Sequence, residues 1–90
     1  MFTKEMNGYL QAMTVCHING KVLHSSSFAN STASSPTACL RKCMGHADCP
    51  SANYHAASST CTLNDKLDLD SPVDLKPDAE YLYLATRVCN

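Results

Sequence analysis

The chain has 90 residues, six of them cysteine, with 44% hydrophobic residues, 17% charged residues and a formal net charge of −1. This length suits one small domain and excludes two-domain enzymes and doubly wound nucleotide-binding folds. A domain of this size buries only about 60–65% of the surface of its unfolded chain, so its core alone provides little stability. The even number of cysteines therefore predicts disulfide staples and a secreted or cell-surface location, on the extracellular side.

The charges exclude some partners. The seven basic residues are scattered along the chain, whereas a protein that reads the nucleic-acid backbone needs clustered Lys and Arg, so no nucleic-acid partner is expected.

No apolar run approaches the roughly 18 residues of a membrane span, so no membrane insertion is expected. The first eleven residues also lack the apolar stretch of a signal peptide. We therefore expect a mature or excised extracellular module, with Met1 added for expression.

The first predicted element is a β-hairpin over residues 14–24. An Asn19-Gly20 pair lies there between β-branched and aliphatic residues. Asn-Gly supplies the two positive-φ positions of a type I′ turn, which predicts a two-residue hairpin with Cys16 opposite Leu23.

The next segment, Ser25–Ser35, is dominated by Ser, Thr, Ala and Asn, which predicts a surface loop. It contains the sequon Asn30-Ser31-Thr32, which makes Asn30 a candidate glycosylation site. A chance match that is never glycosylated is the alternative.

Residues 35–45 carry the pattern of one α-helix, over about 36–44. Ser35 is the predicted N-cap, Pro36 takes the first helical position and Gly45 follows the last turn. Helical spacing gathers the apolar residues into one stripe that faces the core: Pro36, Cys39, Leu40, Cys43 and Met44.

Two short strands are predicted at 51–56 and 60–64, and a final strand at 81–89. The final strand alternates so that Tyr81 and Tyr83 share one face and Leu82 and Leu84 the other. The segment 65–80 between them holds six of the eight acidic residues and two prolines, which predicts a long polar connection. Its acids lack the spacing of an EF-hand calcium loop, so we expect them to be solvated.

The cysteine spacing C-x22-C-x3-C-x5-C-x11-C-x27-C allows fifteen pairings. Cys39 and Cys43 lie one helical turn apart with nearly parallel Cβ vectors, so each is expected to bond a different partner. Gly45 allows the chain to reverse and return Cys49 to Cys43. Cys39 is then expected to bond Cys61 and so fasten the helix to the following strand, and Cys16 to bond Cys89 and join the first strand to the last. The result is a nested set: Cys16–Cys89, Cys39–Cys61 and Cys43–Cys49.

Two chemical alternatives compete with the disulfide interpretation. The run Cys39, Cys43, His46 and Cys49 offers four zinc ligands, but a pair of them lies inside a helix and two cysteines would be left without a purpose. An enzyme would need a free thiolate beside a base, and every cysteine here has a structural partner. We therefore expect no catalytic residues, no metal and no cofactor.

The framework resembles the PAN/Apple domain family over residues 16–89. The resemblance rests on the helical Cys39-Leu40-Arg41-Lys42-Cys43, on Cys49, on Tyr54 and on Cys61-Thr62-Leu63, with outer cysteines Cys16 and Cys89. It implies an α+β fold in which a curved antiparallel sheet of about five strands packs on one helix. Residues 1–90 would form a single domain, with 1–13 as an N-terminal extension or a first strand.

Three positions depart from the Apple domains of coagulation proteases. Ser51 and Ala52 stand where those domains carry large hydrophobic residues, and Asn64 stands where they favour a basic residue. We therefore place the chain in the broad PAN superfamily outside the coagulation group, so its ligand cannot be taken from that group.

What the resemblance implies for function is a non-enzymatic recognition module that mediates protein–protein adhesion. The alternative is a lectin-like, carbohydrate-binding module, since parasite surface members of the family bind galactose. The partner is then an extracellular protein or a glycan, and a homodimer or a tandem array in a larger protein is open. The predicted ligand residues form an aromatic and polar patch on the sheet: Tyr81, Tyr83, Arg87 and His55.

Overall fold

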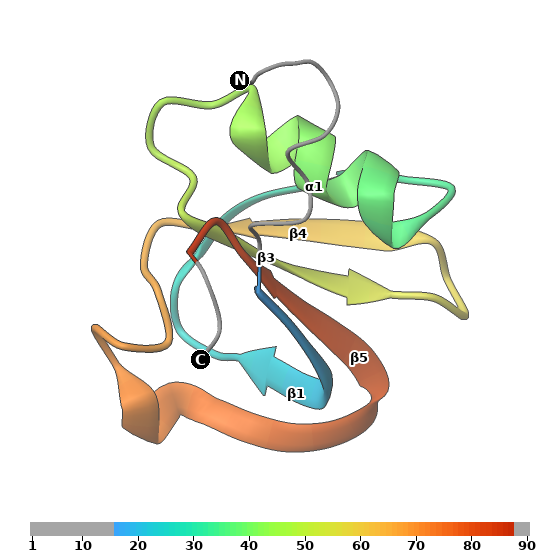
Figure 1. The fold of residues 1–90 in the computed structure, drawn as a ribbon. Helices are drawn as coiled ribbons and strands as arrows, with labels where there is room; N and C mark the ends of the chain where they lie inside the picture. The colour runs from blue at the N-terminus through green and yellow to red at the C-terminus, as the bar shows by residue number, and fades with distance from the viewer. Residues whose placement is uncertain (1–15, 88–90) are drawn as a thin grey trace.

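The computed structural model describes residues 16–87, so the predicted extension or strand at 1–13 lies outside the described residues. Five strands form one antiparallel sheet in the order β1-β5-β3-β4-β2, with one helix on one of its faces (Figure 1). In chain order the elements are β1 (Cys16–Leu23), β2 (Ser27–Thr32), α1 (Pro36–Met44), β3 (Ser51–His55), β4 (Thr60–Asn64), the short 3-10 helix η2 (Pro72–Asp74) and β5 (Leu75–Ala85). The predicted α+β architecture is confirmed.

Helix α1 begins and ends where the sequence predicts. The Ser35 Oγ accepts a hydrogen bond from the Ala38 N–H at 3.1 Å, and the chain leaves the helix at Gly45. Cys39 and Cys43 are fully buried, as the stripe predicts. Met44 is 57% exposed, so its assignment to the stripe was wrong. Because each helical residue turns by about 100°, Met44 lies at the margin of the stripe, well away from Cys43.

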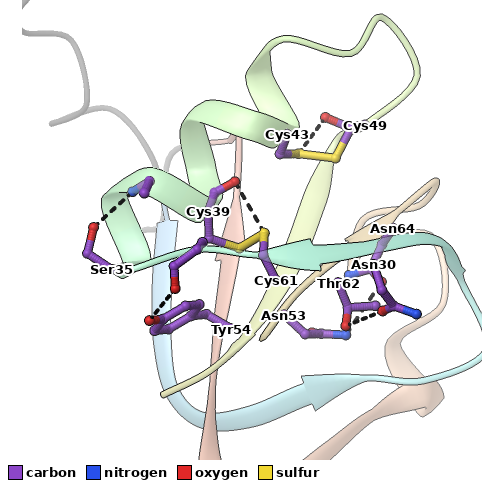
Figure 2. The surroundings of a disulfide bond; sticks show 12 residues. Asn30, Ser35, Cys39, Cys43, Cys49, Asn53, Tyr54, Cys61, Thr62 and Asn64 are labelled. Carbon is purple, nitrogen blue, oxygen red and sulfur yellow. Dashed lines mark hydrogen bonds between the residues drawn. A yellow bond between two sulfur atoms is a disulfide. The ribbon is translucent and has the colours of Figure 1, made fainter. Parts of the chain in front are cut away.

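Two disulfides fasten α1 to the rest of the domain (Figure 2). Cys39 bonds Cys61 on β4, and Cys43 bonds Cys49 in the loop that follows the helix. Both pairs match the predicted set. Cys16 is also disulfide-bonded, and its predicted partner Cys89 lies outside the described residues. The chain therefore uses covalent bonds where a small core provides little stability.

The main core lies between α1 and the sheet. Residues at alternate positions of β3, β4 and β5 point toward the helix and bury Ala52, Tyr54, Cys61, Leu63 and Leu84. The Tyr54 hydroxyl donates to the Ala33 carbonyl at 2.9 Å, which satisfies its buried polar atom. A second, smaller cluster lies around β1 and β5 and contains Cys16, Leu23, Tyr83 and Ala85.

The predicted Asn19-Gly20 hairpin is not formed. Strand β1 turns a sharp corner at Gly20, which has a φ of 76°, and both of its arms pair with β5 rather than with each other (Figure 1). The register jumps from Asn19 opposite Leu82 to Lys21 opposite Pro77. Strand β5 passes outside the corner and follows a longer path, so residues 78–81 of β5 lie opposite the single residue Gly20, an excess of three residues. Asn-Gly therefore marks a bend in a paired strand, and only its glycine has a positive φ.

Two segments predicted to be loops belong to the sheet. Strand β2 lies within the predicted loop at 25–35, and β5 begins at Leu75, inside the predicted connection 65–80. Strand β2 is an edge strand whose side chains are mostly exposed, so its Ser, Thr and Asn residues give no apolar alternation. The N-terminal half of β5 is also exposed, which explains its charged residues.

Candidate binding surfaces

Three of the four predicted ligand residues lie on the sheet face opposite α1. His55 pairs with Tyr81 across β3 and β5, and Asn53 pairs with Tyr83, whereas the neighbouring Tyr54 packs in the core under the helix. The structure then separates the four residues into two groups. His55 and Tyr81 lie together at the surface, and Tyr83 and Arg87 both bind Asp68 in a largely buried network.

The buried network centres on Asp68, in the loop before β5. The Tyr83 hydroxyl donates to Asp68 Oδ1 at 3.1 Å and accepts the Asp68 backbone N–H at 2.8 Å. Arg87 donates to both carboxylate oxygens of Asp68, from Nε to Oδ1 at 3.0 Å and from Nη2 to Oδ2 at 2.6 Å. Tyr83 is fully buried. The network thus fastens the loop onto the sheet, and Tyr83 presents no surface to a ligand.

Ionisation in this network follows from its contacts. The hydrogen bonds from Arg87 hold the pKa of Asp68 below its ordinary value, against the opposing effect of burial. Burial is the main cause that raises the pKa of Tyr83 to about 12. Tyr83 therefore stays a neutral hydrogen-bond donor beside an ionised carboxylate, which suits a structural role.

The group at the surface is a cluster of half-buried and exposed residues that we call the His55 patch: His55, Ser58, Thr60, Glu80 and Tyr81. The rings of His55 and Tyr81 lie 4.8 Å apart with an interplanar angle of 55°. His55 Nε2 lies 2.9 Å from Glu80 Oε1, and Nδ1 lies 2.7 Å from Ser58 Oγ. Both ring nitrogens are thus held, and the patch presents a fixed aromatic pair with a polar border.

A groove of about 220 Å³ runs beside Tyr81, and we call it the Tyr81 groove. Polar residues from several elements line it, among them His24, Ser27, Thr62 and Asp78. Its wall at Leu23 is held by the buried Asn53 amide, which accepts the Leu23 N–H and donates to the Leu23 carbonyl, each at 2.9 Å. The groove therefore combines an aromatic ring, hydroxyl groups and a carboxylate on a fixed support.

A larger groove, of about 820 Å³, lies at the end of the sheet beyond α1, and we call it the Phe28 groove. The Phe28 ring is 43% exposed and meets the His46 ring edge-on at 5.8 Å. Phe28 falls at an irregularity in the β2–β4 register. This surface was not predicted from the sequence, although a single aromatic residue within a Ser-, Thr- and Asn-rich stretch was a usable signal.

Asn30 lies exposed on the edge strand β2. Its side-chain Oδ1 accepts a hydrogen bond from the Thr62 hydroxyl at 2.8 Å, across the β2–β4 pair (Figure 2). The sequon is therefore on the surface, and its glycosylation stays a prediction.

The three departures noted in the sequence also have a place in the structure. Ser51 and Asn64 face each other across β3 and β4, where the Asn64 amide donates to the Ser51 Oγ at 3.2 Å. Both are fully buried, and Ser51 in turn donates to the Lys66 carbonyl. The adjacent Ala52 packs in the core beneath α1. The chain after β4 returns to this end of the sheet, where the Lys66 carbonyl meets Ser51, so the buried Ser51 and Asn64 side chains are both hydrogen-bonded.

The zinc alternative is contradicted by the two disulfides. Cys39, Cys43 and Cys49 are all oxidised in bonds to Cys61 or to each other, whereas zinc needs thiolates. His46 instead lies against Phe28. The cysteines fail as ligands because the helix directs them to different covalent partners.

A five-stranded antiparallel sheet, one helix bonded to it and exposed aromatic grooves define a small disulfide-stapled binding domain. The family comparison gives the same class: the chain belongs to the PAN domain family, whose family model matches residues 15–89. A search of curated proteins found no match.

Membership of this family sets the general function. PAN domains are binding modules for proteins or carbohydrates, occur in extracellular proteins and are generally non-enzymatic. The α1 helix is the longest in residues 16–87 and is far too short to cross a bilayer.

Proposed function

We propose that this domain is a non-enzymatic extracellular recognition module that mediates protein–protein adhesion through the His55 patch. The observation that supports this is the aromatic pair His55 and Tyr81, at 4.8 Å, with both imidazole nitrogens held by neighbouring side chains. Aromatic side chains in fixed positions contribute much contact area at a low entropic cost. They are enriched among the few residues that dominate the energy of protein interfaces.

The test is a binding screen of the 90-residue domain against extracellular proteins. For a partner found this way, Tyr81→Ala is expected to weaken binding at least about tenfold, since truncating an interface hot spot typically costs 2 kcal/mol or more. The matched control is Val73→Ala, which removes an exposed apolar side chain from η2, outside the patch. Equal affinities of the Tyr81 variant and the unchanged domain for every partner would contradict the proposed surface.

The second candidate function is that of a lectin-like module, and the Tyr81 groove favours it. Sugars are bound by stacking of a ring face on an aromatic side chain and by hydrogen bonds from their hydroxyls to carboxylates, amides and hydroxyls. Tyr81 provides the aromatic face, and Asp78, His24 and Thr62 provide polar groups around it. A glycan array separates the two candidates, because a blank array with a positive protein screen rejects the lectin.

We also propose that Asn30 carries an N-linked glycan when the domain passes through a secretory pathway. The hydrogen bond from Thr62 uses the Asn30 Oδ1 and leaves the attachment atom Nδ2 outside that contact. Secretion from eukaryotic cells should give a product whose mass falls on treatment with peptide N-glycosidase. Thr32→Ala, which removes the sequon hydroxyl, should abolish that difference, and an unmodified wild-type product would refute the proposal.

A further inference from the structure

We propose that the Phe28 groove is a second binding site, independent of the His55 patch, and that it accepts an arginine side chain of a partner protein. It is lined by the exposed Phe28 ring and by two carboxylates, Asp48 and Asp65. A guanidinium stacks on an aromatic face and pairs with carboxylates, so one arginine satisfies both features. The other lining residues are His46, Ala47, Cys49, Pro50 and Thr86.

The walls of the groove are held from three sides. The Cys43–Cys49 disulfide closes the loop that carries His46 and Asp48. On the opposite wall, the Asp65 backbone N–H donates to the Ser26 carbonyl at 2.9 Å, directly before β2. A site held in this way loses little conformational entropy when a ligand binds, which favours even a small contact.

The third side is closed by the chain that follows β5. The Thr86 backbone N–H and hydroxyl both donate to the Pro50 carbonyl, at 2.9 and 3.0 Å. Residues from four separate segments therefore meet at the groove and are cross-connected. This arrangement is a formed site in the free domain and needs no closure by a partner.

The charge of the groove selects a cation. Neither the Asp48 nor the Asp65 carboxylate has a hydrogen-bond or salt-bridge partner within residues 16–87, and no lysine or arginine of that range lines the groove. Arg41 and Lys42 line a separate hollow beyond His46. The groove therefore carries the negative charge of two carboxylates, one on each wall, in the same lining as the Phe28 ring.

The experiment uses a single-arginine probe, acetyl-Gly-Arg-Gly-amide, titrated into the ¹⁵N-labelled 90-residue chain at low ionic strength. Saturable amide shifts are expected at Phe28, at 46–49 and at Asp65. The citrulline tripeptide, which keeps the shape and loses the charge, should bind at least about fivefold more weakly. Salt should weaken the arginine complex, because both carboxylates are exposed.

Variants then locate the site. The double variant Asp48→Asn, Asp65→Asn should weaken arginine binding about fivefold, and Phe28→Leu about threefold, as expected for exposed ion pairs and an exposed cation–π contact. The matched control, Asp70→Asn with Asp74→Asn, removes two acids that lie outside the groove and outside the His55 patch and should change the affinity less than about twofold. The amide spectrum of each variant shows directly that it is folded.

Three results would overturn the proposal. They are the absence of saturable shifts in the groove, equal affinity for the arginine and citrulline tripeptides, and equal weakening by the control pair and by the groove pair. The last result would show attraction to the overall charge of the domain. None of these results bears on the His55 patch, so the two sites are tested separately.

Discussion

The Asn53 amide makes two buried hydrogen bonds that were not predicted from the sequence. It lies buried on β3 and gives the Leu23 backbone the hydrogen bonds that a neighbouring strand would otherwise provide. It accepts the Leu23 N–H and donates to the Leu23 carbonyl, each at 2.9 Å. Asn53→Ala removes both bonds at once. The backbone of Leu23, a residue that is 2% exposed, would then lose both partners.

The size of the effect follows from these two groups. Each buried backbone group left without a partner costs about 1–3 kcal/mol. Partial entry of water from the adjacent Tyr81 groove reduces the sum, so we expect a loss of about 3 kcal/mol of unfolding free energy. For a domain of this length, about 3 kcal/mol corresponds to a fall in Tm of about 12–24 °C.

The assay is thermal and urea unfolding of the oxidised protein, followed by tyrosine fluorescence and circular dichroism, because the chain contains no tryptophan. The matched control is Asn30→Ala, which removes an exposed strand asparagine with one hydrogen bond and should change stability by less than about 0.5 kcal/mol. If Asn53→Ala costs under about 1 kcal/mol, or no more than the control, the bridging role assigned to the amide is wrong.

Two further predictions concern the Asp68 network and the disulfides. Because the folded pKa of Asp68 is lowered, its ionised form contributes stability above its ordinary pKa of 3.8, and this contribution is lost as the pH falls through the lowered value. Asp68→Asn should therefore flatten the loss of stability below about pH 5, measured by urea unfolding across pH, and an unchanged slope would contradict the pairing. Replacing Cys39 and Cys61 by alanine should cost about 1 kcal/mol more than replacing Cys43 and Cys49, because the first pair closes the longer loop, with a sequence separation of 22 against 6. Equal costs in the same unfolding assay would show that loop entropy does not set their ranking.

The helix and the Cys43–Cys49 disulfide were predictable because their signals are local. Ser35, Pro36 and Gly45 define the helix ends by backbone chemistry, and helical spacing alone keeps Cys39 from bonding Cys43. The helix ends and the Cys43–Cys49 bond depend on residues within one or two turns of each other. The Cys39–Cys61 bond, with a sequence separation of 22, also required the expectation that the helix packs on the following strand.

The strands of the sheet edges were mispredicted because their partners are distant in sequence. Asn19-Gly20 favours a hairpin when only neighbouring residues are considered, but both arms of β1 pair with β5 instead of with each other. Strand β2 is held by β4 and lies at the edge, so it needs no apolar face of its own. Tertiary pairing overrode local propensity in both places.

The sequence predicted which tyrosines share a face of the sheet, but not which of them reaches the surface. Alternation correctly puts Tyr81 and Tyr83 on one side of β5, opposite the leucines that pack toward α1. Whether such a tyrosine meets solvent depends on what covers the sheet, and here the Asp68 loop covers one end only. Because the Asp68 carboxylate binds Tyr83, the half-buried Tyr81 is the tyrosine on this face that reaches the surface. Asp68 lies in a stretch whose acidic residues were expected to be solvated. Its contact with Tyr83 leaves Tyr81 as the tyrosine of β5 that is available for binding.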